Sequence, residues 1–77
     1  MNEKDFVALC KQTVAEYAGV YEGDVYIVWM CKTLQNNKAM VSTAVADGMY
    51  YELTYNGNKK ELYLDAYKKW ENKCIKL

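Results

Sequence analysis

Histidine and arginine are both absent from this chain of 77 residues, and each absence removes a class of function. Without histidine there is no imidazole for general acid–base catalysis or for activating a serine or cysteine nucleophile. Without arginine the chain lacks the planar group that holds phosphates and base edges through two hydrogen bonds. Ten lysines balance ten acidic residues, so the basic excess typical of nucleic-acid-binding proteins is missing too. We therefore expect no direct DNA binding.

Serine, cysteine and glycine are too scarce or too scattered to form a catalytic or metal site. Ser42 is the only serine, and the four glycines are isolated rather than gathered in a phosphate-binding loop. The cysteines Cys10, Cys31 and Cys74 are odd in number and include no CxxC pair, which disfavours both disulfides and zinc. We expect reduced, buried thiols that serve packing, and a protein that is not an enzyme and has no metal or cofactor.

No apolar run approaches the roughly 20 residues of a membrane span, and the segment Met1 to Asp5 is polar and acidic, unlike a signal peptide. The sequence therefore predicts a cytoplasmic protein without membrane contact. Residues 1–77 contain no repeat or linker and are expected to form a single domain. Because so short a domain buries only about 60% of its unfolded surface, its core must be rich, and 52% of the residues are apolar.

The apolar pattern predicts an α+β fold. A helix is expected over residues 3–18, with Asn2 as its N-cap and Gly19 at its end. From residue 25 onward β-branched and aromatic residues favour strands, near 25–34, 39–46, 49–55 and 58–64. The dipeptides Asn36-Asn37, Asp47-Gly48 and Asn56-Gly57 are typical of two-residue hairpin turns. Asp65 is expected to cap a final helix, which gives a four-stranded antiparallel meander with an N-terminal and a C-terminal helix on one face.

Two-residue turns would set the register of the whole sheet, because side chains alternate between its faces. The core face would then carry Ile27, Trp29, Cys31, Met40, Ser42, Ala44, Met49, Tyr51, Leu53, Leu62 and Leu64. The opposite face would have an apolar middle with charged edges, and its candidate binding residues are Tyr26, Val28, Met30, Lys32, Val41, Thr43, Val45, Tyr50 and Tyr63. A turn longer than two residues would shift a register and redistribute these side chains.

Two features of this second face bear on function. Glu52 and Glu61 become cross-strand neighbours, which could form a carboxylate pair for hydrolysis or metal binding but more simply are solvated side chains near Lys32 and Lys59. Eight tyrosines are the main compositional excess. Tyrosine is common in protein interfaces and as a stacking platform for bases, and it is also a common strand residue in small β proteins. The cluster of Tyr26, Tyr50 and Tyr63 on an uncovered face favours an interface.

The run DVYIVWMCKTLQNNKAMVSTAVADGMYYELTYNG, followed by ELYLDAYKKWENK, covers about two thirds of the chain. It resembles a family of short uncharacterised proteins encoded by phages and prophages of Gram-positive bacteria. The resemblance implies a phage accessory protein, and such proteins often act against host functions, immune systems included. It carries no activity over to individual residues.

The hypothesis from the sequence is a nonenzymatic binding protein, in an anti-defence or host-takeover role, that binds a host protein in the host cytoplasm. The alternative is an oligomeric sponge that sequesters a nucleotide immune signal, with Lys32 or Lys59 holding phosphate. In either case the uncovered sheet face predicts a homo-oligomer or a docking surface, because a monomer would leave a large apolar patch bare.

Overall fold

In the computed structural model, which describes residues 1–77, the chain begins with α1 (Glu3–Ala18), and both ends of this helix are capped as the sequence predicts. The side-chain oxygen of Asn2 accepts a hydrogen bond from the Asp5 amide at 2.8 Å. Gly19 adopts a φ of 71°, which glycine reaches without steric cost, and its amide donates to the Ala15 carbonyl at 2.9 Å. With 16 residues and a polar outer side, α1 is neither long nor apolar enough to cross a membrane.

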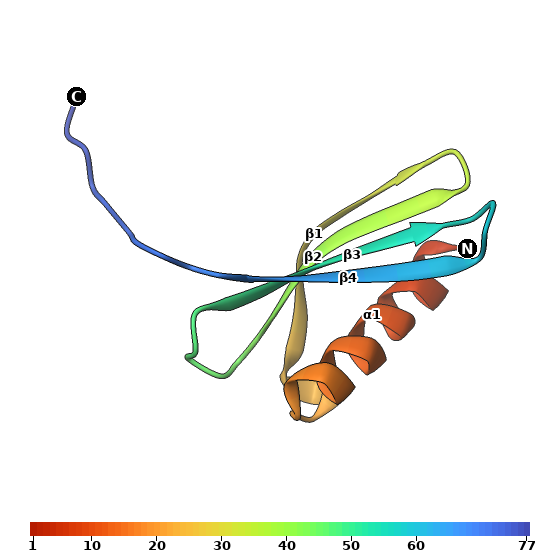
Figure 1. Ribbon diagram of the computed structural model, residues 1–77, viewed down its shortest axis with the longest axis horizontal. Helices are drawn as coiled ribbons and strands as arrows, with labels where there is room; N and C mark the ends of the chain where they lie inside the picture. Colours follow the sequence, from red (N-terminus) through yellow and green to blue (C-terminus); the bar gives the residue numbers. More distant parts are fainter.

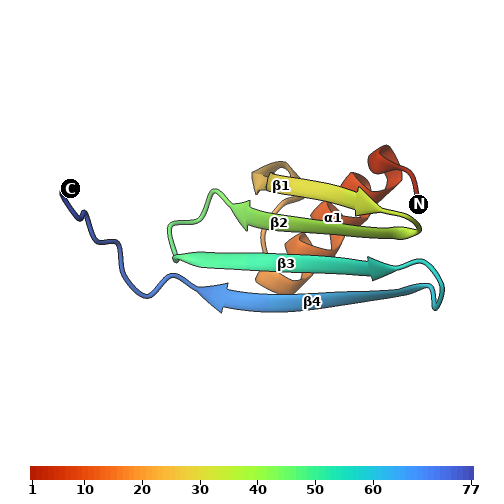
Figure 2. The same cartoon turned by 90° about the horizontal axis from the view of Figure 1, so that it is seen from above.

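A short 3-10 turn, η1 (Glu22–Asp24), leads from α1 into an antiparallel sheet. Its four strands are β1 (Val25–Thr33), β2 (Asn36–Thr43), β3 (Met49–Asn56) and β4 (Glu61–Lys68), and they lie side by side in chain order. The predicted meander is therefore confirmed. The helix lies against one face of the sheet (Figure 1) and crosses it diagonally (Figure 2), packing mainly on β1 and β2.

The C-terminal helix expected from Asp65 onward is wrong. Residues 61–68 instead form β4, which pairs with β3 over eight consecutive positions from Asn56↔Glu61 to Met49↔Lys68. This pairing satisfies backbone groups that a helix would have satisfied internally, and it continues one residue further, where Lys69 donates to the Gly48 carbonyl at 2.7 Å. Beyond that point the chain has no regular structure and runs away from the sheet (Figure 1).

The turns differ from the predicted dipeptides. The β1–β2 turn consists of Leu34 and Gln35, not Asn36-Asn37, and Leu34 takes the positive φ of 56°. The two asparagines are used in tertiary contacts instead. The side-chain oxygen of Asn36 accepts from the Gly57 amide at 3.0 Å, and the side-chain amide of Asn37 donates to the Met1 carbonyl at 3.3 Å.

The other two turns are longer than predicted. The β2–β3 loop has five residues, 44–48, and the Asp47 carboxylate accepts from the Met49 amide at 3.0 Å. The β3–β4 loop has four residues, 57–60, and the Asn56 side chain accepts from two amides within it. An even loop leaves the predicted faces of β4 unchanged, whereas the odd loop reverses the faces of β2 relative to β3.

A β-bulge redirects the second half of β1. The register with β2 shifts between Ile27 and Trp29, so that Val28 is the extra residue. Before the bulge Ile27 lies on the helix side, as predicted. After it Met30 faces α1, and Trp29 and Cys31 face away, which reverses the expected arrangement.

The hydrophobic core lies between α1 and the sheet. Its members are Phe6, Cys10, Val14, Ala15, Val25, Ala39, Val41, Tyr51 and Leu53. Ile27, Met30, Met49, Tyr55, Leu62 and Leu64 pack around them and are partly buried. The predicted core positions on β3 and β4 are thus confirmed, but those on β2, Met40 and Ser42, face the other way, and Ala44 lies in the exposed β2–β3 loop.

Candidate functional site: the uncovered face of the sheet

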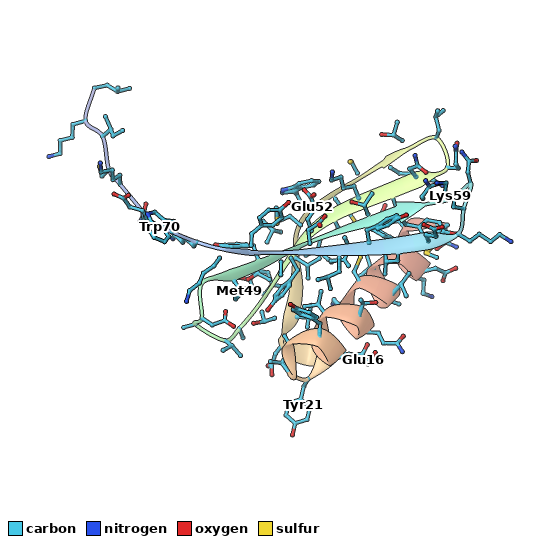
Figure 3. The ribbon with its side chains drawn as sticks, viewed as in Figure 1. Glu16, Tyr21, Met49, Glu52, Lys59 and Trp70 are labelled. Carbon is cyan, nitrogen blue, oxygen red and sulfur yellow. The ribbon has the colours of Figure 1, made fainter.

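The sheet face turned away from α1 has no covering element, and we call it the open face. The strand registers place on it Tyr26, Trp29, Cys31, Lys38, Met40, Ser42, Tyr50, Glu52, Thr54, Glu61, Tyr63, Asp65 and Tyr67. Figure 3 shows Glu52 on this side of the sheet, whereas Tyr21, at the far end of α1, projects on the other side.

Aromatic side chains lie on both edges of the open face and pair there with large side chains of the neighbouring strands. Trp29 lies opposite Met40 on β1 and β2, and Tyr50 lies opposite Tyr67 on β3 and β4. Tyr26, Trp29 and Tyr67 are 50%, 44% and 51% exposed. Half-buried aromatics of this kind offer large contact area while their rotamers are already restricted by neighbours. The arrangement is therefore suited to contact with another molecule.

Carboxylates outnumber lysines on the open face. Lys38 forms an ion pair with Glu52 at 3.4 Å, and Asp65 lies directly opposite Glu52 on β4. Glu61 adds a third acid at the end of β4, so the three acids outnumber the two lysines of this surface, Lys38 and, at its end, Lys69. Such an excess favours a partner with positive charge and opposes phosphate groups.

The carboxylate pair of Glu52 and Glu61, the less favoured alternative from the sequence, does not form. Glu61 lies opposite Asn56 rather than beside Glu52, whose carboxylate neighbour is Asp65. The Glu61 carboxylate instead accepts a hydrogen bond from the Tyr63 hydroxyl. This hydrogen bond, together with the negative charge of Glu61, raises the pKa of Tyr63 above its ordinary value.

A groove of about 300 Å³ hollows one end of the open face, where the β2–β3 loop folds beside the sheet. Tyr26 and Tyr50 line it from the strands, Val45 lines it from the loop, and Lys69 lines it from the start of the C-terminal segment. Ser42 lies in the groove, and its hydroxyl is occupied by donating to the Met49 carbonyl at 3.0 Å. The groove is large enough for a side chain of a partner.

The nine binding residues predicted from the sequence do not share one surface. Tyr26, Tyr50 and Tyr63 lie on the open face as predicted. Val28 at the bulge and Val45 in the β2–β3 loop are each 47% exposed.

The other four predicted residues lie elsewhere, because the odd loop and the bulge reverse their strands. Val41 and Thr43 are buried on the helix side of β2. Met30 and Lys32 also face the helix side of β1, after the bulge. These four side chains therefore cannot belong to a surface that includes the open-face tyrosines.

Sequence reasoning misplaced several residues of the open face. Tyr67 was expected on a C-terminal helix, and four others were expected in the core: Trp29, Cys31, Met40 and Ser42. The alternation of Leu62, Tyr63, Leu64, Asp65, Ala66 and Tyr67 has a period of two and could have extended the fourth strand to its observed end. Nothing comparable in the local sequence marks the bulge at Val28.

A second hollow of about 390 Å³ lies on the helix side, between the start of α1 and the β1–β2 hairpin. It is lined by Glu3, Phe6, Met30, Cys31, Lys32 and Asn37. Asn37 is 3% exposed, and its side-chain oxygen has no hydrogen-bond partner. No group of three or more His, Cys, Asp or Glu side chains is placed to hold a metal ion, here or elsewhere.

The three cysteines differ from the expectation that all are buried. Cys10 lies in the core, and burial raises the pKa of its thiol to about 12, so it stays protonated near neutral pH. Cys31 and Cys74 are exposed, because one follows the bulge on the open face and the other lies in the C-terminal segment that was expected to be a helix.

The chain belongs to a family of unknown function, DUF6275, whose sequence model matches residues 4–77. The match thus includes α1, all four strands and the C-terminal segment. No curated protein matches the chain, and no solved structure matches it either.

Proposed function

We propose that this member of the family is a nonenzymatic binding module that docks on another protein through the open face of its sheet. The observation that carries the proposal is the row of half-exposed aromatics on a sheet face that no element covers, with Tyr26, Trp29 and Tyr67 each about half exposed. Interfaces are enriched in such residues, and aromatic side chains dominate their binding energy.

The charges of the open face define the kind of partner. Its three acids outnumber its two lysines, so a partner that presents lysine or arginine would gain from both the carboxylates and the aromatic rings. The resemblance to phage-encoded proteins adds a biological setting, in which the partner is a host protein and the module is an anti-defence or host-takeover factor.

Sequestration of a nucleotide signal has less support. Its phosphate-binding candidates were Lys32 and Lys59, but Lys32 faces the helix side and Lys59 lies in the β3–β4 loop, as Figure 3 shows. Neither lies among the open-face tyrosines. Of the lysines that do lie there, Lys38 is already paired with Glu52, and Lys69, beside Tyr26 in the groove, is a single lysine on a surface that carries more acids than lysines.

The test compares aromatic truncations on the two sides of the molecule. The variant Tyr26→Ala with Trp29→Ala removes two rings from the open face, whereas Tyr21→Ala removes an 85% exposed ring at the far end of α1. Each tagged protein is used to capture partners from a Gram-positive bacterial lysate. The affinity of any protein held by the wild type is then measured for all three.

We expect the open-face variant to bind at least about tenfold more weakly, which corresponds to 1.4 kcal/mol, and Tyr21→Ala to bind like the wild type. Equal affinity of all three folded proteins would place the contact elsewhere. A panel of linear and cyclic nucleotides serves as the opposing arm, since a ligand at 100 times its Kd stabilises by about 2.7 kcal/mol. A thermal shift of that size, without protein capture, would replace our proposal with sequestration.

A further inference from the structure

The two edges of the sheet differ in how well they are protected against pairing. The edge strand β1 carries the bulge at Val28. A bulge disfavours pairing with a further strand, because it twists the edge and interrupts its row of backbone groups. The other edge, β4, has no bulge and no proline, and its register with β3 is unbroken over eight residues. The outer side of β4 is therefore a row of unpaired backbone groups.

One hydrogen bond shows which residues of β4 direct their backbone groups away from β3. The Lys69 amide donates to the Gly48 carbonyl, which makes these two a hydrogen-bonded pair of the β3–β4 ladder. Such pairs alternate along antiparallel strands. Tyr67, Asp65 and Tyr63 therefore direct their backbone groups to β3. The intervening residues direct theirs outward, and these are Leu62, Leu64, Ala66 and Lys68.

We infer that β4 pairs with β4 of a second copy of this chain, antiparallel and about a two-fold axis at Leu64, so that two four-stranded sheets become one of eight strands. This assembly uses the edge of the sheet and not the open face, so it stands independently of the proposed function. An antiparallel pair of identical strands is self-complementary, as the interface of a two-fold dimer must be.

The side chains favour this register. With Leu64 opposite the second copy's Leu64, seven residues of each strand pair, and Leu62 lies opposite Ala66 on the helix side. On the open face Tyr63 lies opposite Asp65, and Glu61 lies opposite Tyr67. A shift by one step in one direction would set Asp65 against Asp65, and in the other direction Glu61 against Asp65. Like charges directly opposite each other destabilise a strand pair, so the Leu64 register is preferred.

Burial on the helix side of β4 also leaves room for a neighbouring strand. α1 packs mainly on β1 and β2, so Leu62 and Leu64 are only partly buried. Both side chains would lose further exposure next to the second copy, which adds apolar burial to the backbone pairing.

The first test removes one outward donor. Ala66→Pro deletes an amide that points away from β3, so the monomer ladder is kept, but two hydrogen bonds of the dimer are lost by symmetry. Ala66→Val is the matched control, because it keeps the amide and suits a strand. Light scattering should give twice 9.0 kDa for the wild type and Ala66→Val, and 9.0 kDa for Ala66→Pro. A monomeric wild type at near-millimolar concentration, or a folded Ala66→Pro that stays dimeric, would overturn the inference.

A cross-link keeps the inference testable even if Ala66→Pro fails to fold. Opposite residues of a hydrogen-bonded pair have Cα atoms about 5.5 Å apart, within the range of a disulfide. With Cys31 and Cys74 replaced by Ser, Leu64→Cys should form a covalent dimer under mild oxidation, and Asp65→Cys should not. No cross-link at Leu64→Cys refutes the pairing, and a cross-link at Asp65→Cys alone refutes the register.

Discussion

Two valines that sequence reasoning placed on the same outer surface provide a sharp test of the sheet register. Val41 is fully buried on the helix side of β2, whereas Val45 lies in the β2–β3 loop and is 47% exposed. Replacing each with alanine removes the same two carbon atoms. Any difference between the two variants therefore reports the environment and not the chemistry of the change.

The expected magnitudes follow from burial. Removing two buried carbons from Val41 costs about 1.6 kcal/mol of transfer free energy, and the cavity raises this to about 2 kcal/mol. At Val45 half of the side chain is already in water and no cavity forms, so the cost should be about 0.5 kcal/mol. A domain of this size has a total unfolding free energy of about 4–12 kcal/mol, so the loss expected for Val41→Ala is a large part of it.

Thermal unfolding followed by circular dichroism, at one protein concentration, measures both variants. Since 1 kcal/mol lowers Tm by about 4–8 °C in a domain of this size, Val41→Ala should lose roughly 8–16 °C and Val45→Ala only a few degrees. Equal losses, or a larger loss at Val45, would mean that β2 presents its other face to α1. The open face as defined by Met40 and Trp29 would then be refuted as well.

Four further outcomes check separate features of the structure. A thiol reagent should modify two cysteines of the native protein promptly and Cys10 only as the protein unfolds, since burial raises the pKa of that thiol to about 12; prompt modification of all three would contradict its burial. Gly19→Ala should lower stability by about 1–2 kcal/mol, because the φ of 71° strains any residue with a Cβ atom; an unchanged urea midpoint would rule out that conformation. Deleting residues 70–77 should change the unfolding free energy by less than about 0.5 kcal/mol, because this segment is exposed throughout; a drop above that in calorimetry would show that it packs on the sheet. Glu61→Gln should lower the pKa of Tyr63 toward 10.0, because the carboxylate that accepts a hydrogen bond from its hydroxyl and disfavours the phenolate is gone; an unchanged NMR titration of that tyrosine would exclude the contact.

Local chemistry was enough to predict the elements whose ends are marked by side chains. Asn2 and Gly19 define α1 because a cap depends only on residues within one turn of it. The faces of β3 and β4 were also predicted correctly, with Leu53 inside and Glu52 outside, because the loop between these strands has an even number of residues.

The faces of β2 could not be predicted from its own residues. Residues 39–46 (AMVSTAVA) carry small or apolar side chains at both odd and even positions, so either face could be buried. The choice depends on the number of residues in the β2–β3 loop, and Asp47-Gly48 resembles a two-residue turn although it ends a five-residue loop. Because this loop has an odd number of residues, Val41 lies in the core and not on the surface where it was predicted.

The C-terminal helix was predicted from Asp65 as an N-cap and from a helical spacing that puts Tyr67, Trp70 and Cys74 on one face, and tertiary pairing overrode it. Residues after Asp65 also include alanine, lysine and glutamate, which favour helices in isolation. The edge of β3 nevertheless continues past the predicted end of the fourth strand, and it offers four further backbone pairs to residues 65–68. Helix propensities of a few tenths of a kcal/mol per residue are smaller than the contribution of these pairs.

The edge and the open face are coupled through β4, which contributes to both. If two copies join at Leu64, the open faces become one continuous surface, and the two Trp29 side chains lie on strands seven intervals apart, roughly 33 Å along the sheet. A partner with two equivalent sites at that spacing would be held by both copies at once, and its apparent affinity would exceed that of a single face without any new contact. Ala66→Pro should then weaken binding of such a two-site partner while leaving the affinity of one isolated site unchanged, because the substitution lies on the helix side of β4 and touches no open-face residue. Loss of single-site affinity in the folded variant would show instead that β4 acts on the partner directly.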